Sequence, residues 1–308
     1  MLDLDWERYV PLMDIHIDDI QKIFAQYDKT LTVSGFEAIR LGCRNSNYAV
    51  GTNRGKFLLR VTNSADFNNE PVAYRLVKDR VTIPALLFHT TAPYGRIFIY
   101  QYIEGVSLQK VMAQSRRCEM IFVKQAAEAA AVIHSTPPEK LSGLKELDVP
   151  PFALWYQSFL DTPAVAANLG GPLRDRVLRL VQDKQAYLPE IDAYQSFIHC
   201  DFRPANMLVD NNQRVFFVDW ESACTGHSLA DIGQFFRYRT FFTQDHFALF
   251  EQVYHSVAHR KLPPHWFELA LFRDLVNPLQ LLSSVQNAPR RRADFIKIIE
   301  ETLAYWGY

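Results

Sequence analysis

The chain has 308 residues, a formal net charge of −1 and 48% apolar residues, which is typical of a globular protein with one large domain or two lobes. The near-neutral charge argues against nucleic-acid binding. No apolar run is long enough to cross a bilayer, the acidic N-terminus does not resemble a signal peptide, and the four cysteines form no Cys-x-x-Cys pair, so we expect a cytoplasmic protein that binds neither nucleic acid nor membrane.

The first third of the chain alternates short apolar runs with turn residues. Helical spacing over residues 17–27, and again over 70–78, predicts two helices. Five runs with the spacing and composition of strands lie around the second helix, at residues 34–41, 47–51, 56–61, 86–90 and 96–102. The short turns between them favour a mostly antiparallel sheet with one inserted helix.

The pattern changes near residues 102–105. Helices are predicted over 108–114 and 121–134, and helical sequence then dominates apart from two β-like runs at 207–209 and 215–218. The fold class is therefore α+β and bilobal, with a small N-terminal antiparallel-sheet lobe over residues 1–102. A larger helical C-terminal lobe is expected over residues 103–308.

Chemistry concentrates in residues 198–221. Asp201 follows an apolar run, and Pro204 prevents a helix from starting there, so a loop leads to Asn206. The hairpin predicted next brings Asn206 close to Asp219, which ends its second strand, and Glu221 follows two residues later. These oxygen ligands suit Mg²⁺, and H-x-D-x-x-x-x-N followed by a strand-end Asp is the arrangement of a kinase catalytic loop. The alternative is a hairpin that uses Asp and Asn for turns and caps.

Three segments together carry a family resemblance: His199-Cys200-Asp201, Asp219-Trp220-Glu221 and Asp231-Ile232-Gly233. They resemble the aminoglycoside phosphotransferase and choline kinase superfamily, whose usual loop is H-G-D-x-x-x-x-N, followed by D-x-D or D-x-E and then D-L/I-A/G. Cys200 replaces the usual glycine of that loop. The resemblance implies a protein-kinase-like fold, ATP as co-substrate, Mg²⁺ as cofactor and a small-molecule acceptor.

The resemblance also implies roles by position. Asp201 would accept the proton of the acceptor hydroxyl or orient it, Asn206 and Asp219 would hold Mg²⁺, and Glu221 would assist a second metal or the acceptor side. Arg203 would touch the γ-phosphate, although pairing with a local carboxylate explains it equally well.

Two further residues of these segments are implied to be structural. His199 is expected to make structural hydrogen bonds, and Asp231 is expected to brace the backbone of the catalytic loop.

The N-terminal lobe is expected to bind the nucleotide. Leu41–Tyr48 matches the looser phosphate loop of the family, in which Asn45 and Ser46 could offer backbone N–H groups; a plain hairpin turn is the alternative. Arg60 stands where kinases carry the lysine for the α- and β-phosphates, and Glu70 could pair with it.

The adenine would be held where the lobes join. By resemblance, backbone groups of Gln101 and Ile103 would hydrogen-bond its edge, an expectation that rests on their position in the chain alone.

The acceptor is expected to be small, because no long activation segment ending in Ala-Pro-Glu follows Asp219. The aromatic residues of one predicted helix could line its site or form a core stripe, and several acidic residues could meet a cationic acceptor or simply face solvent. These candidates are Trp155, Tyr156, Phe159, Asp161, Glu300 and Glu301.

Aminoglycosides, choline-like amines, amino-acid alcohols and sugars all stay open as acceptors. The sequence thus predicts a phosphotransferase that moves the γ-phosphoryl group of ATP to a hydroxyl of a small molecule. The alternative is a nucleotide-binding regulatory pseudokinase, favoured by Arg60, by Cys200 and by the glycine-poor loop.

Overall fold

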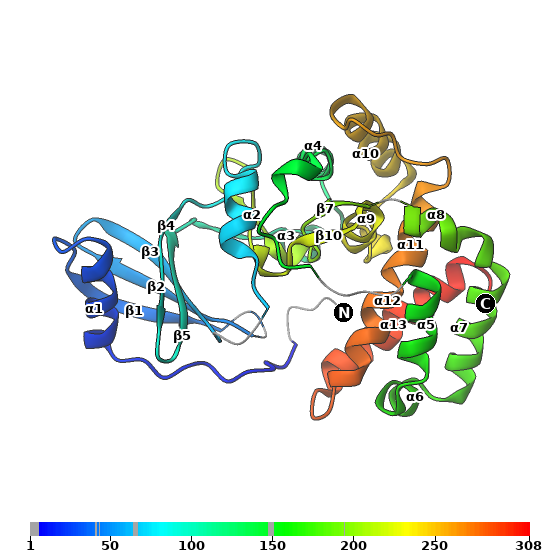
Figure 1. Cartoon of the computed structure of the whole chain (residues 1–308), viewed down its shortest axis with the longest axis horizontal. Helices are drawn as coiled ribbons and strands as arrows, with labels where there is room; N and C mark the ends of the chain where they lie inside the picture. Colours follow the sequence, from blue (N-terminus) through cyan, green and yellow to red (C-terminus); the bar gives the residue numbers. More distant parts are fainter. Residues whose placement is uncertain (1–5, 41, 43, 64–66, 147–150, 194) are drawn as a thin grey trace.

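The computed structural model describes residues 6–40, 42, 44–63, 67–146, 151–193 and 195–308. Within them, an antiparallel sheet forms the N-terminal part and helices dominate the C-terminal part, as predicted (Figure 1). The strands are β1 Val33–Ile39, β2 Ser46–Thr52, β3 Gly55–Thr62, β4 Leu86–Ala92, β5 Gly95–Gln101, β6 Gly105–Ser107, β7 Gln195–Ile198, β8 Met207–Asp210, β9 Val215–Phe217 and β10 Cys224–His227. The helices are α1 Ile17–Tyr27, α2 Glu70–Val77, α3 Leu108–Ser115, α4 Met120–His134, α5 Phe152–Leu160, α6 Pro163–Leu169, α7 Gly171–Asp183, α8 Leu188–Ala193, α9 Ser228–Phe235, α10 Gln244–Val257, α11 Trp266–Asp274, α12 Val276–Leu281 and α13 Pro289–Tyr305.

The N-terminal sheet has the strand order β1-β2-β3-β5-β4, and all its pairs are antiparallel. Alternate residues of the strands point to one face, where Tyr48, Val50 and Leu59 are buried. Helix α1 covers this face with Ile20 and Phe24, whose spacing of four places them on one side of the helix. The apolar pattern of the sequence therefore specified both this helix and the strands beneath it.

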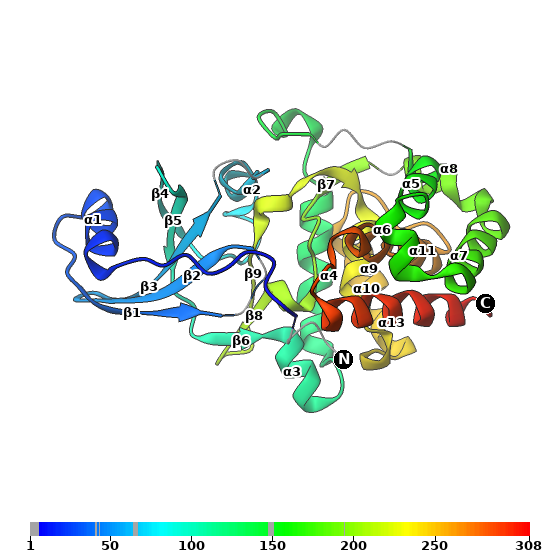
Figure 2. The ribbon, with the colours of Figure 1, turned by 90° about the horizontal axis from the view of Figure 1, so that it is seen from below.

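The segment before α1 links the sheet to the helical part (Figure 2). Near the sheet, the backbone N–H of Met13 donates to Ser46 Oγ at 2.9 Å. At the other end, the carboxylate of Glu7 accepts the backbone N–H groups of Arg290 and Arg291, at 3.0 and 3.2 Å, at the start of α13. A carboxylate at a helix N-terminus is favourable because it satisfies orphan donors and complements the helix dipole.

The C-terminal part contains more β structure than the sequence indicated. Besides the predicted hairpin β8–β9, strand β6 pairs with β8, and β7 pairs antiparallel with β10. The expectation of only two β-like runs was wrong, because β6, β7 and β10 have three or four residues each and are defined by long-range pairing. Gly105 is required in β6, since a Cβ there would lie 2.4 Å from the carbonyl oxygen of Val209.

Helices α9 and α11 are in very close contact. A Cβ on Gly233 would lie 2.3 Å from the carbonyl oxygen of Ala270, so only glycine permits this approach. On the same side, Arg237 donates to both carboxylate oxygens of Asp274, at 2.8 and 2.6 Å, and to Asn277 at 2.9 Å. The side chains of this ion pair are 1% and 5% exposed.

The other predicted elements agree with the structure to within one or two residues, except that the strand predicted over 34–41 ends at Ile39 and Leu41 lies outside the described residues. In the part of the chain that the structure describes, no helix is both long and apolar enough to cross a membrane.

We expect Asp274→Asn to destabilise the protein by about 3–5 kcal/mol, because it leaves the buried guanidinium of Arg237 without its charge partner. Denaturant unfolding would measure the loss. The control is Asp161→Asn, which breaks the exposed pair with Arg174 and should cost less than about 1 kcal/mol. Equal effects of the two substitutions would contradict the importance of the buried pair.

Candidate active site

Side chains of the buried helix α9 hold the loop of residues 199–206 through hydrogen bonds. Asp231, which is fully buried, accepts the backbone N–H groups of His199 and Cys200, both at 2.8 Å. The side chain of Gln234, one turn later, accepts from the backbone N–H of Phe202 at 2.7 Å and donates to the carbonyl of Cys200 at 3.1 Å. Asp231 therefore braces the loop backbone, as expected, and Gln234 is a second brace that the sequence did not reveal.

Asp201 faces two partners within this loop. Arg203 donates to its carboxylate at 2.5 and 3.2 Å, and the amide of Asn206 donates to it at 2.7 Å. Burial raises the pKa of Asp201, but the charge and hydrogen bond of Arg203 outweigh burial, so the pKa lies below its ordinary value. The carboxylate is thus ionised and remains 30% exposed. Arg203 adopts the pairing with a local carboxylate that was the alternative to a phosphate contact.

The hairpin brings the next two residues together as predicted. Met207 pairs with Phe217, and the backbone N–H of Val218 donates to the carbonyl of Asn206 at 3.0 Å, so Asn206 lies beside the end of β9 where Asp219 follows. Asp219 has a positive φ of 71°. A non-glycine residue rarely adopts this left-handed conformation, and such residues cluster at functional sites.

Arg60 connects the sheet to this cluster. Its Nη1 donates to Glu70 and to Asp219, each at 3.0 Å, and its Nε donates to Asn47 at 3.1 Å. Burial lowers the pKa of Arg60, but the two carboxylates outweigh it and hold the pKa above its ordinary value, so the guanidinium stays charged. The expected Arg60–Glu70 pair therefore forms, and it also includes Asp219.

Glu221 faces the phosphate-loop region. The side-chain amide of Asn45 donates to it at 2.8 Å. Burial and the nearby charge of Asp219 raise the pKa of Glu221 to about 8. The two acidic residues thus lie close together, and Asn45 reaches them from the sheet.

Other predicted nucleotide residues are engaged by neighbouring segments. The Ser46 hydroxyl accepts from Met13, and Arg8 donates to the backbone carbonyls of Gly42 and Asn45, at 2.6 and 2.8 Å. Leu41 and Cys43, which complete the predicted phosphate loop, lie outside the described residues. The contact of Arg8 was missed because nothing local in the sequence connects residue 8 to this loop.

Gln101 and Ile103 lie where the sheet meets the helical part. Both the backbone and the side chain of Gln101 hydrogen-bond Ala85, at 2.9 and 3.4 Å. Together with residues of the β8–β9 turn, Gln101 and Ile103 line a cavity of about 250 Å³. They thus border open space at the junction, although the Gln101 backbone N–H is already bonded.

The aromatic residues of α5 are divided between core and surface. Tyr156 is buried and donates to the carbonyl of Phe272, which supports the core interpretation for this residue. Trp155 and Phe159 are half-buried and contact each other, with ring centroids 5.8 Å apart.

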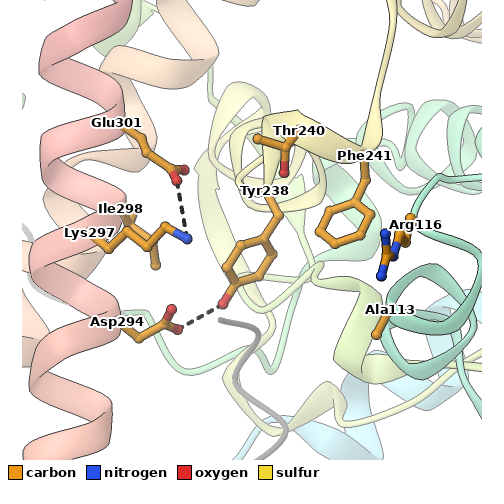
Figure 3. Close-up of a pocket in the computed structure, with 9 residues that line it drawn as sticks. All are labelled: Ala113, Arg116, Tyr238, Thr240, Phe241, Asp294, Lys297, Ile298 and Glu301. Atoms are coloured by element: carbon orange, nitrogen blue, oxygen red, sulfur yellow. Dashed lines mark hydrogen bonds and ion pairs between the residues drawn. The ribbon is translucent and has the colours of Figure 1, made fainter.

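A second cavity, of about 240 Å³, lies between the end of α3 and helix α13; of the predicted site residues it contains Glu301, an acceptor candidate, and none of the catalytic, nucleotide or metal residues (Figure 3). Its polar side chains interact with one another: Lys297 with Glu301 at 3.6 Å, and Tyr238 with Asp294 at 3.0 Å. The predicted cluster around Asp201 is therefore the better candidate site.

The residues available for a metal are Asn206, Asp219 and Glu221, which offer only oxygen ligands. This set suits Mg²⁺, which takes few protein oxygens and completes its shell with phosphates and water. Among the described residues, no group of three or more His, Cys, Asp or Glu side chains is arranged to hold a metal by itself. The chemistry of the set thus fits a metal that arrives with a nucleotide.

The sequence matches the phosphotransferase enzyme family over residues 35–272. No curated protein matches the chain. Among solved structures, an aminoglycoside 2′-phosphotransferase-IIIa in complex with GDP is similar, with a TM-score of 0.73 at 17% identity over 94% of this chain and 99% of the other. A spectinomycin phosphotransferase with ADP and spectinomycin has a TM-score of 0.69 at 14% identity, over 94% and 95% of the two chains. A mutant aminoglycoside phosphotransferase with AMP-PNP and hygromycin B has a TM-score of 0.68 at 18% identity, over 93% and 98%. These likenesses show that the fold is the kinase-like one.

The backbone at Cys200 explains why the family uses glycine there. Its φ is 65°, in the left-handed region that costs a side-chain-bearing residue about 1–2 kcal/mol. We expect Cys200→Gly to change the free energy of unfolding by less than about 1 kcal/mol, because relief of strain offsets lost packing and greater chain entropy. Cys200→Val should lower the free energy of unfolding by ~1–2 kcal/mol relative to the wild type, because a β-branched residue is unfavourable at positive φ. Wild-type stability of the valine variant in denaturant unfolding would contradict this backbone geometry.

His227 makes the protein sensitive to acid. Its ring accepts the backbone N–H of Leu229 at 3.1 Å at the start of α9, and burial lowers its pKa from 6.5 to about 3, with Arg273 acting in the same direction. Between these values the unfolded chain binds a proton that the folded chain does not. This difference lowers stability as pH falls, by up to about 1.4 kcal/mol per pH unit.

His227→Asn keeps a capping acceptor but removes the titration. Unfolding free energies measured between pH 6.5 and 5 should therefore fall less steeply for the variant than for the wild type. Identical slopes would show that His227 is not held neutral.

Proposed function

Because this chain belongs to the phosphotransferase enzyme family, we propose that it transfers the γ-phosphoryl group of ATP to a hydroxyl group of a small molecule. The observation that carries the proposal is the convergence of Asp201, Asn206 and Asp219 at the end of the β8–β9 hairpin, beside the Arg60–Glu70 pair. Phosphoryl transfer depends mainly on positioning and charge stabilisation, and this cluster supplies both.

Asp201 acts on the acceptor. Its ionised and partly exposed carboxylate accepts a hydrogen bond from the acceptor hydroxyl and takes its proton as that oxygen bonds to the γ-phosphorus. The bond from phosphorus to the bridging oxygen breaks, and ADP leaves with the electron pair. Asn206 holds the Asp201 carboxylate in place through its amide.

Asn206, Asp219 and Glu221 would hold Mg²⁺, which supplies charge neutralisation to the phosphates when bound. Arg60 binds the α- and β-phosphates, since an arginine fork suits phosphate oxygens. Arg203 moves from Asp201 toward the γ-phosphate, which frees the carboxylate for the acceptor hydroxyl. Glu70 keeps Arg60 in position throughout.

The nucleotide lies between the two lobes, residues 1–102 and 103–308. Backbone groups of Asn45 and Ser46 face the phosphates, and backbone groups of Gln101 and Ile103 face the adenine. The similar proteins solved with ADP and with AMP-PNP support a nucleotide at this junction; another was solved with GDP. The cytoplasmic location expected from the sequence agrees with the use of ATP.

In the pseudokinase alternative, Arg60 stays paired with Asp219 and Arg203 stays paired with Asp201. This alternative predicts nucleotide binding without transfer to any acceptor. Arg60 and Arg203 contact the Asp residues that an enzyme would need. An enzyme and a pseudokinase would therefore have the same fold, and only an activity measurement distinguishes them.

We expect Asp201→Asn to lower kcat by about 100- to 10,000-fold, the usual contribution of a positioned base, while ADP with Mg²⁺ still raises the Tm. Phosphoryl transfer would be measured on a panel of aminoglycosides, amines, hydroxy amino acids and sugar derivatives. Asp245→Asn, at an exposed position of α10, is the matched control. An Asp201→Asn variant with full turnover would refute the role of Asp201. Absence of transfer by the wild type to every acceptor class would favour the pseudokinase.

A further inference from the structure

The packing of α11 against α9 fixes the position of Arg273 relative to the loop of residues 199–206. Arg273 lies near the end of α11, which is pressed against α9 at Gly233. Helix α9 in turn carries Asp231, the residue that holds the loop backbone at His199 and Cys200. Two rigid contacts therefore connect the position of Arg273 to that of Asp201.

The guanidinium of Arg273 is stacked on two aromatic rings of α5. Its central carbon lies 5.1 Å from the ring centroid of Phe152 and 5.0 Å from that of Trp155. It also lies near the thiols of Cys200, the residue before Asp201, and of Cys224. The side chain thus lies between α5 and α11, next to the catalytic loop.

No hydrogen bond or ion pair engages this guanidinium within the described part of the chain. Asp274 is the next residue, but both its carboxylate oxygens are taken by Arg237. Arg273 is half-buried, and burial lowers its pKa, which reflects the cost of keeping the charge there. An arginine has five N–H donors, and leaving them unmet in a partly desolvated place is unfavourable.

Aromatic stacking holds the flat face of Arg273 and leaves its edge for a ligand. Arginine held in this way is well suited to a carboxylate or phosphate, which it binds through two parallel hydrogen bonds. We propose that Arg273 binds an oxyanion, a carboxylate or a phosphate, carried by the acceptor whose hydroxyl is directed to Asp201. This inference rests on the proposed function and names the class of its substrate.

The charges nearby favour an anionic acceptor over a cationic one. Arg237 is paired with Asp274 and Arg203 with Asp201, so among the described residues their charges are matched, whereas that of Arg273 is not. Of the three acidic candidates for a cationic acceptor, Asp161 is paired with Arg174 and Glu301 with Lys297, while Glu300 is exposed on α13; Asp274 is paired with Arg237. The unmatched positive charge in the described part of this region is therefore that of Arg273.

The test compares small hydroxyl acceptors that carry a carboxylate or phosphate with related acceptors that carry neither. Glycerol is set against D-glycerate and glycerol 3-phosphate, ethanolamine against serine, and spectinomycin serves as a cationic acceptor. ADP release is followed for the wild type, Arg273→Met, Arg273→Lys and the control Arg179→Met, an exposed arginine of α7. We expect anionic members to be preferred, and Arg273→Met to raise their KM about tenfold or more. Arg273→Lys should restore part of this loss, because it keeps the charge and loses the fork.

A preference for glycerol, ethanolamine or spectinomycin, unchanged in Arg273→Met, would overturn the inference while leaving the phosphotransferase intact. If no compound is phosphorylated, the proposed function fails, and the anion site is judged by binding alone. Glycerate or glycerol 3-phosphate should then raise the Tm of the wild type, with Mg²⁺ and ADP present, more than glycerol does. The same comparison in Arg273→Met should show no such difference. Equal shifts in the two proteins, or none in either, would also overturn the inference.

Discussion

The bonds from the backbone of the loop of residues 199–206 to Asp231 are the constraint on which the candidate site depends. The loop of residues 199–206 buries Phe202 in the core yet exposes the carboxylate of Asp201, so its backbone needs a fixed path between the two. Asp231 solves this by accepting two N–H groups from inside the protein, where a charge-assisted hydrogen bond is strong. His134 interacts with the same carboxylate at 3.2 Å. The left-handed backbone of Cys200 can persist because these bonds determine it.

The rest of the site is a set of carboxylates, and arginines neutralise the charges of two of them. Asp201 is paired with Arg203, and Asp219 with Arg60. Without Arg60, the ionised Asp219 would lie unneutralised beside Glu221 in a partly buried place; burial and then the charge of Asp219 raise the pKa of Glu221. In the proposed function, a nucleotide with its metal would bring both negative phosphates for the arginines and positive charge for the carboxylates. Binding would then exchange the partners of these groups without creating new charge.

The sequence predicted the parts of the site that lie close together in the chain. The spacing from Asp201 to Asn206 and the hairpin that returns to Asp219 are local patterns, and the structure places these residues side by side. Strands β7 and β10 and the contact of Arg8 with the phosphate-loop region were not predictable, because they depend on partners far away in sequence. Gln234 could have been found, since it lies three residues after Asp231 on the same helix face.

The residues proposed to bind the acceptor lie on other elements than those that hold the loop of residues 199–206. The loop is held by hydrogen bonds from α9, whereas Arg273, on α11 and stacked on α5, makes no hydrogen bond to the loop among the described residues. A change at Arg273 or Trp155 would leave the bonds of Asp231 and Asp201 in place. The proposed anion site at Arg273, stacked on Trp155, would thus select a substrate without touching the reacting atoms, so that specificity could diverge on this fold while the reaction stays the same.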